Sequence, residues 1–223
     1  MVKRLQILAA LALLTASPAQ GELPTYTCVK TAAAAMVDVS DLSGRRQHAH
    51  PTQVRMLWDE EQLYVLFIAT APDAWSTLAD RDDRLWNEEV VEFYADPDGD
   101  GANCVEIEVN PLGAVLDLHC PDEREEQHWR PQAQWHAEGM RWAVRGMRSP
   151  EVRADEAWMV ELSVPWAAMP EVTREPFEGA ESLRVNLCRC QMRPDGTGEL
   201  TSWTAATKRF SELDVMGRLL LVE

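Results

Sequence analysis

Two aromatic residues, Trp86 and Phe210, each stand in a stretch of charged and polar residues. That setting predicts loops for both. The apolar face of a sugar ring packs well on an aromatic side chain, and two rings across a slot would hold one sugar residue. The alternative is that both rings belong to the hydrophobic core, and the sequence leaves both interpretations open.

Carboxylates form the second candidate group. Glu92, Glu106, Glu108 and Asp117 fall on predicted neighbouring strands, where they could accept hydrogen bonds from hydroxyls. A pair of them could also hydrolyse a glycoside, which needs one carboxyl with a raised pKa and one that stays ionised. No nucleophile and base accompany them, so we interpret Glu106 as a solvated side chain and favour binding over catalysis. Asn186 is a further candidate, for a ligand or for a neighbouring loop.

Asp96, Asp98 and Asp100 alternate in a glycine-rich turn. Calcium prefers hard oxygen ligands on flexible loops, so this turn is a candidate calcium site. The segment is too short for an EF-hand and lacks its distal glutamate. An Asp-Pro-Asp-Gly sequence is also a good hairpin turn without any metal.

The five cysteines raise the question of disulfides. Cys104 and Cys120 flank a predicted hairpin that turns at residues 110–113, and counting outward places them nearly opposite each other. They are the first candidate disulfide. Cys188 and Cys190 share one face of a predicted strand, and one of them could reach Cys28. Buried, unpaired cysteines are the other interpretation.

The elements that must position these residues are short strands. In residues 104–109 the valine and isoleucine side chains alternate with Glu106 and Glu108, which is the period of a strand with one buried face. Polar turns separate about ten such segments, and this predicts an all-β, two-sheet antiparallel β-sandwich with short helical turns in its loops. We expect a helical turn at 166–169 and a short helix within 76–84, and strands at 53–57, 63–69, 90–95, 104–109, 114–119, 141–147, 158–164, 183–190, 200–204 and 218–222.

The first residues resemble a processing signal. Lys3 and Arg4 precede a short apolar run, and a small-residue site follows at residues 17–19. This predicts a signal peptide at residues 1–19, cleaved after Ala19, and a single secreted or periplasmic domain at residues 20–223. The net charge of −16 disfavours nucleic acid and anionic lipid as partners, and no segment is long and apolar enough to span a membrane.

Six segments in the same order and spacing resemble the family-9 carbohydrate-binding modules, which share a DOMON-like β-sandwich. They are LWDEEQLYVLFIA, LWNEEVVEFYADPDGDG, EIEVNPLGAVLDL, WMVELSVPW, LRVNLCR and SWTAATKRFSELDVMGRLLL, and together they cover roughly residues 54–222. The resemblance implies non-catalytic binding of an oligo- or polysaccharide between two aromatic rings. It also implies structural calcium and a part in polysaccharide degradation. Members of the family are often appended to secreted xylanases, but this sequence carries no catalytic domain, so we expect any partner glycoside hydrolase to be encoded separately.

The resemblance places the first ring of the aromatic clamp on Trp86. It places the second on Phe210, where well-studied modules have Trp. An acidic side chain that accepts bonds from sugar hydroxyls falls on Glu92. Glu108 stands where the family leads us to expect an arginine, which exchanges a bidentate donor for an acceptor and changes which hydroxyls can be read.

Two other functions remain as alternatives. The same sandwich architecture occurs in haem b electron-transfer domains that use Met or Lys as axial ligands, and the chain has nine Met. The second alternative is a glycoside-processing enzyme built on the carboxylates.

Overall fold

The computed structural model describes residues 23–30, 37–39, 50–71, 74–120, 134–146, 157–169, 182–204, 206 and 209–222. The predicted signal peptide and its cleavage site lie outside these residues. Within them, none of the helical segments has the length and apolar character needed to cross a membrane.

The described chain consists almost entirely of strands joined by turns. All ten predicted strands are present, and two N-terminal strands, β1 and β2, escaped the sequence analysis. The helical turn expected after the strand that ends at Pro165 is η3 (Trp166–Ala168), whereas the helix expected within 76–84 is wrong, because helical structure begins only with η1 (Leu85–Asn87). The strands are β1 (Thr25–Lys30), β2 (Val37–Val39), β3 (Thr52–Trp58), β4 (Gln62–Thr70), β5 (Glu89–Asp96), β6 (Cys104–Val109), β7 (Val115–Cys120), β8 (Arg141–Arg145), β9 (Ala157–Pro165), β10 (Ser182–Met192), β11 (Gly198–Ser202) and β12 (Gly217–Val222), with a last helical turn η4 (Leu213–Val215) before β12.

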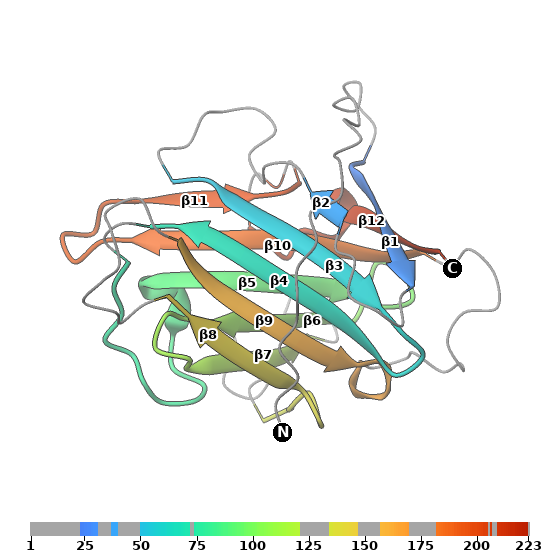
Figure 1. Ribbon diagram of the computed structural model, residues 1–223, viewed down its shortest axis with the longest axis horizontal. Coiled ribbons are helices and arrows are strands. Elements are labelled where there is room, and N and C mark those ends of the chain that lie inside the picture. The colour runs from blue at the N-terminus through green and yellow to red at the C-terminus, as the bar shows by residue number, and fades with distance from the viewer. Residues whose placement is uncertain are drawn as a thin grey trace.

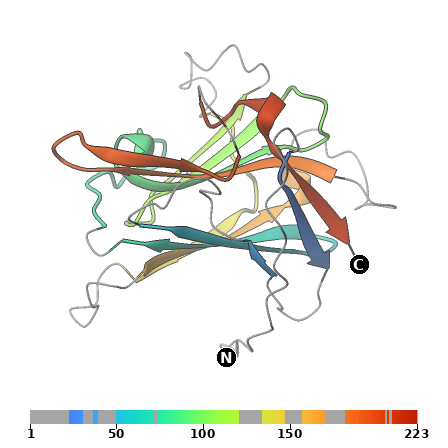
Figure 2. The same ribbon diagram turned by 90° about the horizontal axis from the view of Figure 1, so that it is seen from above.

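The strands stack in two layers, as Figures 1 and 2 show. Their hydrogen-bonded order is β7-β6-β5-β10-β12-β1-β3-β4-β9-β8, while β11 pairs with β10 and β2 with β3. β12 and β1 connect the layer that contains β5 and β10 to the layer that contains β3, β4 and β9. The β-sandwich is therefore confirmed. Its sheet is mixed, because β1 pairs parallel with both β12 and β3 while the remaining described pairs are antiparallel.

The hydrophobic core lies between the two layers. The alternation seen in β6 sends Val105, Ile107 and Val109 into this core, and all three are fully buried. Alternate residues of β9, from Trp158 to Val164, enter it from the other layer. Burial of this apolar surface is the main force that holds the layers together.

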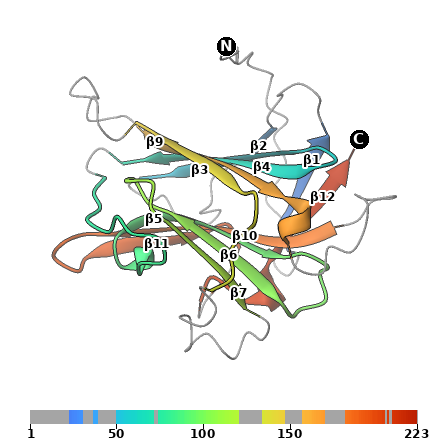
Figure 3. The same cartoon turned by 90° about the horizontal axis from the view of Figure 1, so that it is seen from below.

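A second apolar cluster covers the opposite face of β5, β6, β7 and β10. We call it the outer cluster; it comprises Leu85, Val90, Tyr94, Cys104, Ala114, Leu116, Leu118, Cys188, Cys190, Leu213 and Met216. Leu85 comes from η1 and Leu213 from η4, so two loops cover this face of the sheet. Figure 3 shows β5, β6 and β7 fanned beside β10 in this layer.

The predicted hairpin between β6 and β7 is confirmed. Gly113 adopts a φ of 85°, which glycine tolerates without strain, and the Asn110 side chain accepts hydrogen bonds from the backbone N–H groups of Leu112 and Ala114, both at 3.0 Å. The register pairs Cys104 directly with Cys120. The side chain of Cys120 lies outside the described part of the structure, so the disulfide stays a prediction.

The other expected cysteine pairing is wrong. Cys28 lies in the core between the layers, whereas Cys188 and Cys190 belong to the outer cluster on the far face of β10. All three are free thiols. The sheet itself separates them, which strand alternation along β10 alone could not reveal.

Candidate functional site

Three glutamates meet on the outer face of the sheet. The register places Glu92 of β5 directly opposite Glu108 of β6, and Tyr94 opposite Glu106. One carboxylate oxygen from each of Glu92, Glu106 and Glu108 lies within 4.8 Å of the other two. We call these three residues the carboxylate cluster. Glu106, interpreted from the sequence as merely solvated, is its half-buried member.

Neighbouring side chains donate to this cluster. The Tyr94 hydroxyl lies 2.6 Å from Oε2 of Glu92 and 3.0 Å from Oε1 of Glu106, and the Cys190 thiol lies 2.9 Å from Oε1 of Glu92. Burial raises the pKa of Glu92 to about 7, and the charge of Glu106 adds to the effect. Burial, followed by the charges of Glu92 and Glu106, also raises the pKa of Glu108 well above its usual range.

The two predicted rings lie at the edges of the same face. Trp86 lies in η1 and Phe210 in the turn before η4; both are half-buried and pack against the outer cluster. Phe210 meets Tyr94 edge-on, with ring centroids 6.5 Å apart and an interplanar angle of 64°. The structure thus brings Trp86, Phe210, Glu92 and Glu108 to one face of one sheet.

Asn186 anchors the loop that carries Phe210. It is fully buried, and its amide nitrogen donates to the carbonyl of Phe210 at 2.8 Å. Its oxygen accepts from the backbone N–H of Leu187 at 3.0 Å and from the Ser202 hydroxyl at 3.1 Å. Of the two roles considered for Asn186, these contacts match the second: it holds the loop that carries Phe210.

Asp117 does not join the carboxylate cluster. Its carboxylate pairs with the Arg81 guanidinium, accepts the backbone N–H of Ala137 at 2.8 Å, and lies 3.3 Å from Nδ1 of His136. These bonds tie β7 to two flanking loops, which is a structural role.

Asp96, Asp98 and Asp100 come together as the sequence indicated. One carboxylate oxygen from each lies within 4.8 Å of the other two. Asp96 is buried and accepts the backbone N–H groups of Gly99 at 2.9 Å and Gly101 at 3.0 Å. Burial raises the pKa of Asp96 to about 6, with the charges of Asp98 and Asp100 adding to the shift. A set of hard oxygens in a glycine-rich turn fits calcium.

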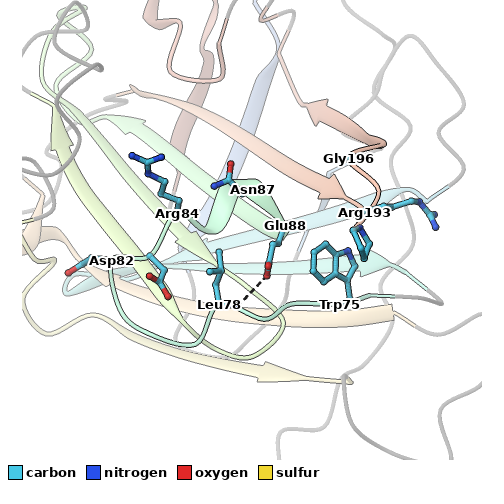
Figure 4. A pocket seen from close by; sticks show the side chains of 10 residues that line it. Trp75, Leu78, Asp82, Arg84, Asn87, Glu88, Arg193 and Gly196 are labelled. Carbon is cyan, nitrogen blue, oxygen red and sulfur yellow. Dashed lines mark hydrogen bonds between the residues drawn. The ribbon is translucent and has the colours of Figure 1, made fainter.

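A pocket that the sequence analysis missed lies beside η1 (Figure 4). It has a volume of about 580 Å³ and opens between the loop that precedes β5 and the turn between β10 and β11. Trp75, Arg84, Asn87 and Arg193 line it, and the Trp75 indole N–H donates to the carbonyl of Met192 at 2.6 Å. The signal that pointed to Trp86, an aromatic residue among polar neighbours between strands, also applies to Trp75.

Glu88 closes the floor of this pocket. Its carboxylate accepts bonds from the Ser76 hydroxyl at 2.8 Å and from the backbone N–H groups of Thr77 at 2.6 Å and Leu78 at 3.2 Å. These bonds fold the loop that carries Trp75 back onto the start of β5.

Comparison with known proteins places the chain in a family. The model of the carbohydrate family 9 binding domain-like family matches residues 28–223. No curated protein sequence matches. A Bacteroides uniformis protein, provisionally described as carbohydrate-binding, has a similar structure at 14% identity, with a TM-score of 0.71 over 90% of this chain and 100% of that one.

A family 9 carbohydrate-binding module from Caldicellulosiruptor kristjanssonii has a similar structure in two complexes, one with cellotriose and one with glucose. With cellotriose the identity is 11% and the TM-score 0.58, over 88% of this chain and 93% of the module. With glucose the identity is 12% and the TM-score 0.59, over 89% and 95%. At such identities the likeness concerns the fold. The family model, which spans most of the sequence, shows that the chain belongs to the carbohydrate family 9 binding domain-like family.

Proposed function

We propose that this protein binds carbohydrate without transforming it, and that the sugar packs between Trp86 and Phe210. The observation that carries the proposal is the position of these rings: two half-exposed aromatic side chains from separate loops border one face that bears carboxylates. Membership of the family supports it, as do the cellotriose and glucose complexes of the Caldicellulosiruptor kristjanssonii module.

The chemistry divides between stacking and hydrogen bonding. The aromatic rings stack against the C–H faces of the sugar. The half-buried Glu106 reaches the surface, where it accepts hydrogen bonds from sugar hydroxyls. Glu92 and Glu108 are each 1% exposed and lie behind it, where they shape the site. Desolvation of sugar hydroxyls offsets much of the gain, so we expect modest affinity.

Calorimetric titration with a panel of soluble oligosaccharides tests the proposal. Trp86→Ala should weaken the best ligand on the order of tenfold or more, about 1.4 kcal/mol, because one stacking wall is lost. Phe210→Ala should act in the same direction. Trp142→Ala is the matched control: Trp142 is an exposed tryptophan on β8 in the other layer, and its loss should leave affinity unchanged. Equal binding by wild type and Trp86→Ala, or no binding across the panel, would contradict the clamp.

Binding is favoured over the glycoside-processing alternative by the direction of the pKa shifts. Glu92 and Glu108 both shift upward, whereas hydrolysis needs one carboxyl to stay ionised at neutral pH. Sugar turnover that Glu92→Gln abolishes while binding persists would establish catalysis instead. A Soret band in the freshly purified protein would establish the haem alternative.

Export, a role in polysaccharide degradation and calcium binding complete the proposal. The protein acts after export through its signal peptide, and it assists polysaccharide degradation beside a separately encoded glycoside hydrolase. Calcium binds in the turn that carries Asp96, Asp98 and Asp100, where it offsets the repulsion among three carboxylates. Mass spectrometry of the exported protein reads the mature N-terminus and so tests export. Calcium titration of the Asp98→Asn variant tests metal binding in the turn.

A further inference from the structure

The carboxylate cluster is unusual because two of its carboxyl groups face each other inside the protein. Glu92 and Glu108 are directly opposed on neighbouring antiparallel strands, and each is 1% exposed. Like charges in that position destabilise a sheet, and a buried carboxylate without a counter-charge is far more costly than an exposed one. The fold therefore holds two acidic side chains where two apolar ones would be favourable.

The hydrogen bonds of the protein satisfy only part of this cluster. Both oxygens of Glu92 have partners, in Tyr94 and Cys190. The carboxyl group of Glu108 accepts the backbone N–H of Trp86 and shares a side-chain hydrogen bond with Glu106. Oε2 of Glu108 is buried and has no hydrogen-bond partner. A buried polar atom left without a partner marks a missing donor or cation.

Tyr94 and Cys190, which hydrogen-bond to Glu92, carry no positive charge. They can donate hydrogen bonds, but they cannot neutralise two or three carboxylates.

We propose that Glu92, Glu106 and Glu108 bind a hard divalent cation of the calcium type. Three carboxylate oxygens within 4.8 Å of one another can converge on one ion with small side-chain adjustments, since calcium–oxygen distances are about 2.4 Å. Oxygen-only ligation selects calcium, magnesium or manganese over softer metals. The half-buried Glu106 gives the ion a route from solvent, and water completes its coordination.

This site is separate from the aspartate turn. Glu92 lies in the middle of β5, whereas Asp96 is the last residue of that strand and its turn projects beyond the sheet. The cation site also does not require a sugar, so it is tested with the metal alone, and its failure would leave the proposed carbohydrate binding standing.

The experiment is a titration of metal into EDTA-treated, dialysed protein at pH 7.5. Calcium binding is followed by calorimetry, and Mn²⁺ binding by the loss of the free-ion electron paramagnetic resonance signal. Three proteins are compared: wild type, Glu108→Gln and Asp98→Asn. Glu108→Gln should lose one ion or bind it on the order of tenfold or more weakly, because one of three charged ligands is gone. Asp98→Asn should keep that ion and lose only the one held by the turn.

The titrations distinguish an ion bound by the carboxylate cluster from one bound by the aspartate turn, and both from proton sharing among the glutamates. The proposal is overturned if Glu108→Gln binds as many ions as wild type with the same affinity, or if wild type binds no ion. In the latter case the carboxyls share protons instead. If Glu108→Gln fails to fold, as judged by circular dichroism, Glu106→Gln replaces it, because Glu106 is half-buried and its loss leaves the buried pair intact. The proposal is then overturned if Glu106→Gln binds as many ions as wild type with the same affinity, or if wild type binds no ion.

Discussion

At the scale of single residues, the environment of Glu92 governs its chemistry. A carboxyl in solution is ionised at neutral pH, but burial beside Glu106 raises the pKa of Glu92 to about 7. Glu92 therefore retains protons at a pH where an exposed glutamate is ionised. The identity of the residue sets its usual pKa, and only its neighbours explain the shift.

This shift makes the contribution of Glu92 to stability depend on pH. Its folded pKa lies above the unfolded value, so its favourable contribution is complete below about pH 4.5 and is lost as the pH rises through about 7. Relative to wild type, Glu92→Gln should gain on the order of 1 kcal/mol or more in unfolding free energy between pH 5 and pH 8. Urea unfolding at both pH values, in EDTA, measures the difference. The same offset at both pH values would contradict the shift.

At the scale of elements, one helical turn contributes to two candidate binding surfaces. η1 follows a loop that Glu88 fixes to the start of β5. Trp86 packs against the outer cluster, whereas the next residue, Asn87, lines the pocket with Trp75. The pocket offers an aromatic ring, an amide and guanidinium groups, the types of group that bind sugars.

An oligosaccharide longer than the clamp should extend into this pocket. Trp75→Ala should therefore weaken a trisaccharide several-fold and leave the affinity for the matching monosaccharide unchanged, since one sugar residue fills the clamp. Because the Trp75 indole also bonds the Met192 carbonyl, Asn87→Ala serves as a second variant that keeps this anchor. Calorimetry with both ligands measures the effect. Equal losses for both ligands would show that the pocket acts only through the fold.

At the scale of the whole molecule, a buried ion pair joins the two layers. Nη2 of Arg189 in β10 lies 2.6 Å from Oε1 of Glu89 in β5, and both side chains are 1% exposed. The indole N–H of Trp158 in β9 donates to the same Glu89 oxygen at 3.1 Å. Nη1 of Arg189 reaches the Thr52 hydroxyl in β3 at 3.2 Å and the Thr70 carbonyl in β4 at 3.0 Å. Polar groups of five strands, β3, β4, β5, β9 and β10, therefore meet at this ion pair.

Removing one partner of this pair should be costly. Arg189→Met should lower the unfolding free energy by about 3–5 kcal/mol, because it leaves the Glu89 charge buried without its counter-ion. The double variant Glu89→Gln with Arg189→Met should lose less than the sum of the two single losses. Urea denaturation of the four proteins completes this cycle, and additive losses would show that the pair is not coupled.

Much of the architecture could be predicted because strand signals are local. The alternation of Val105, Ile107 and Val109 with glutamates identified the buried face of β6, and the Asn110–Gly113 turn set its register with β7. β1 and β2 were missed. β1 pairs parallel with β12 from the opposite end of the chain, and no local sequence pattern records such a partner.

The sequence by itself determined ten of the twelve strands in the described part of the chain, the family and the residue types at the site: Trp86 and Phe210 in polar stretches, acids on alternate strand positions, and three aspartates in one turn. These features depend on neighbours along the chain. Only the tertiary structure decided that Glu106 joins Glu92 and Glu108, that Asn186 holds the Phe210 loop, and that Asp117 belongs elsewhere. Pairing and burial set those outcomes, because a carboxylate's partners, and therefore its charge, come from strands that are distant in sequence.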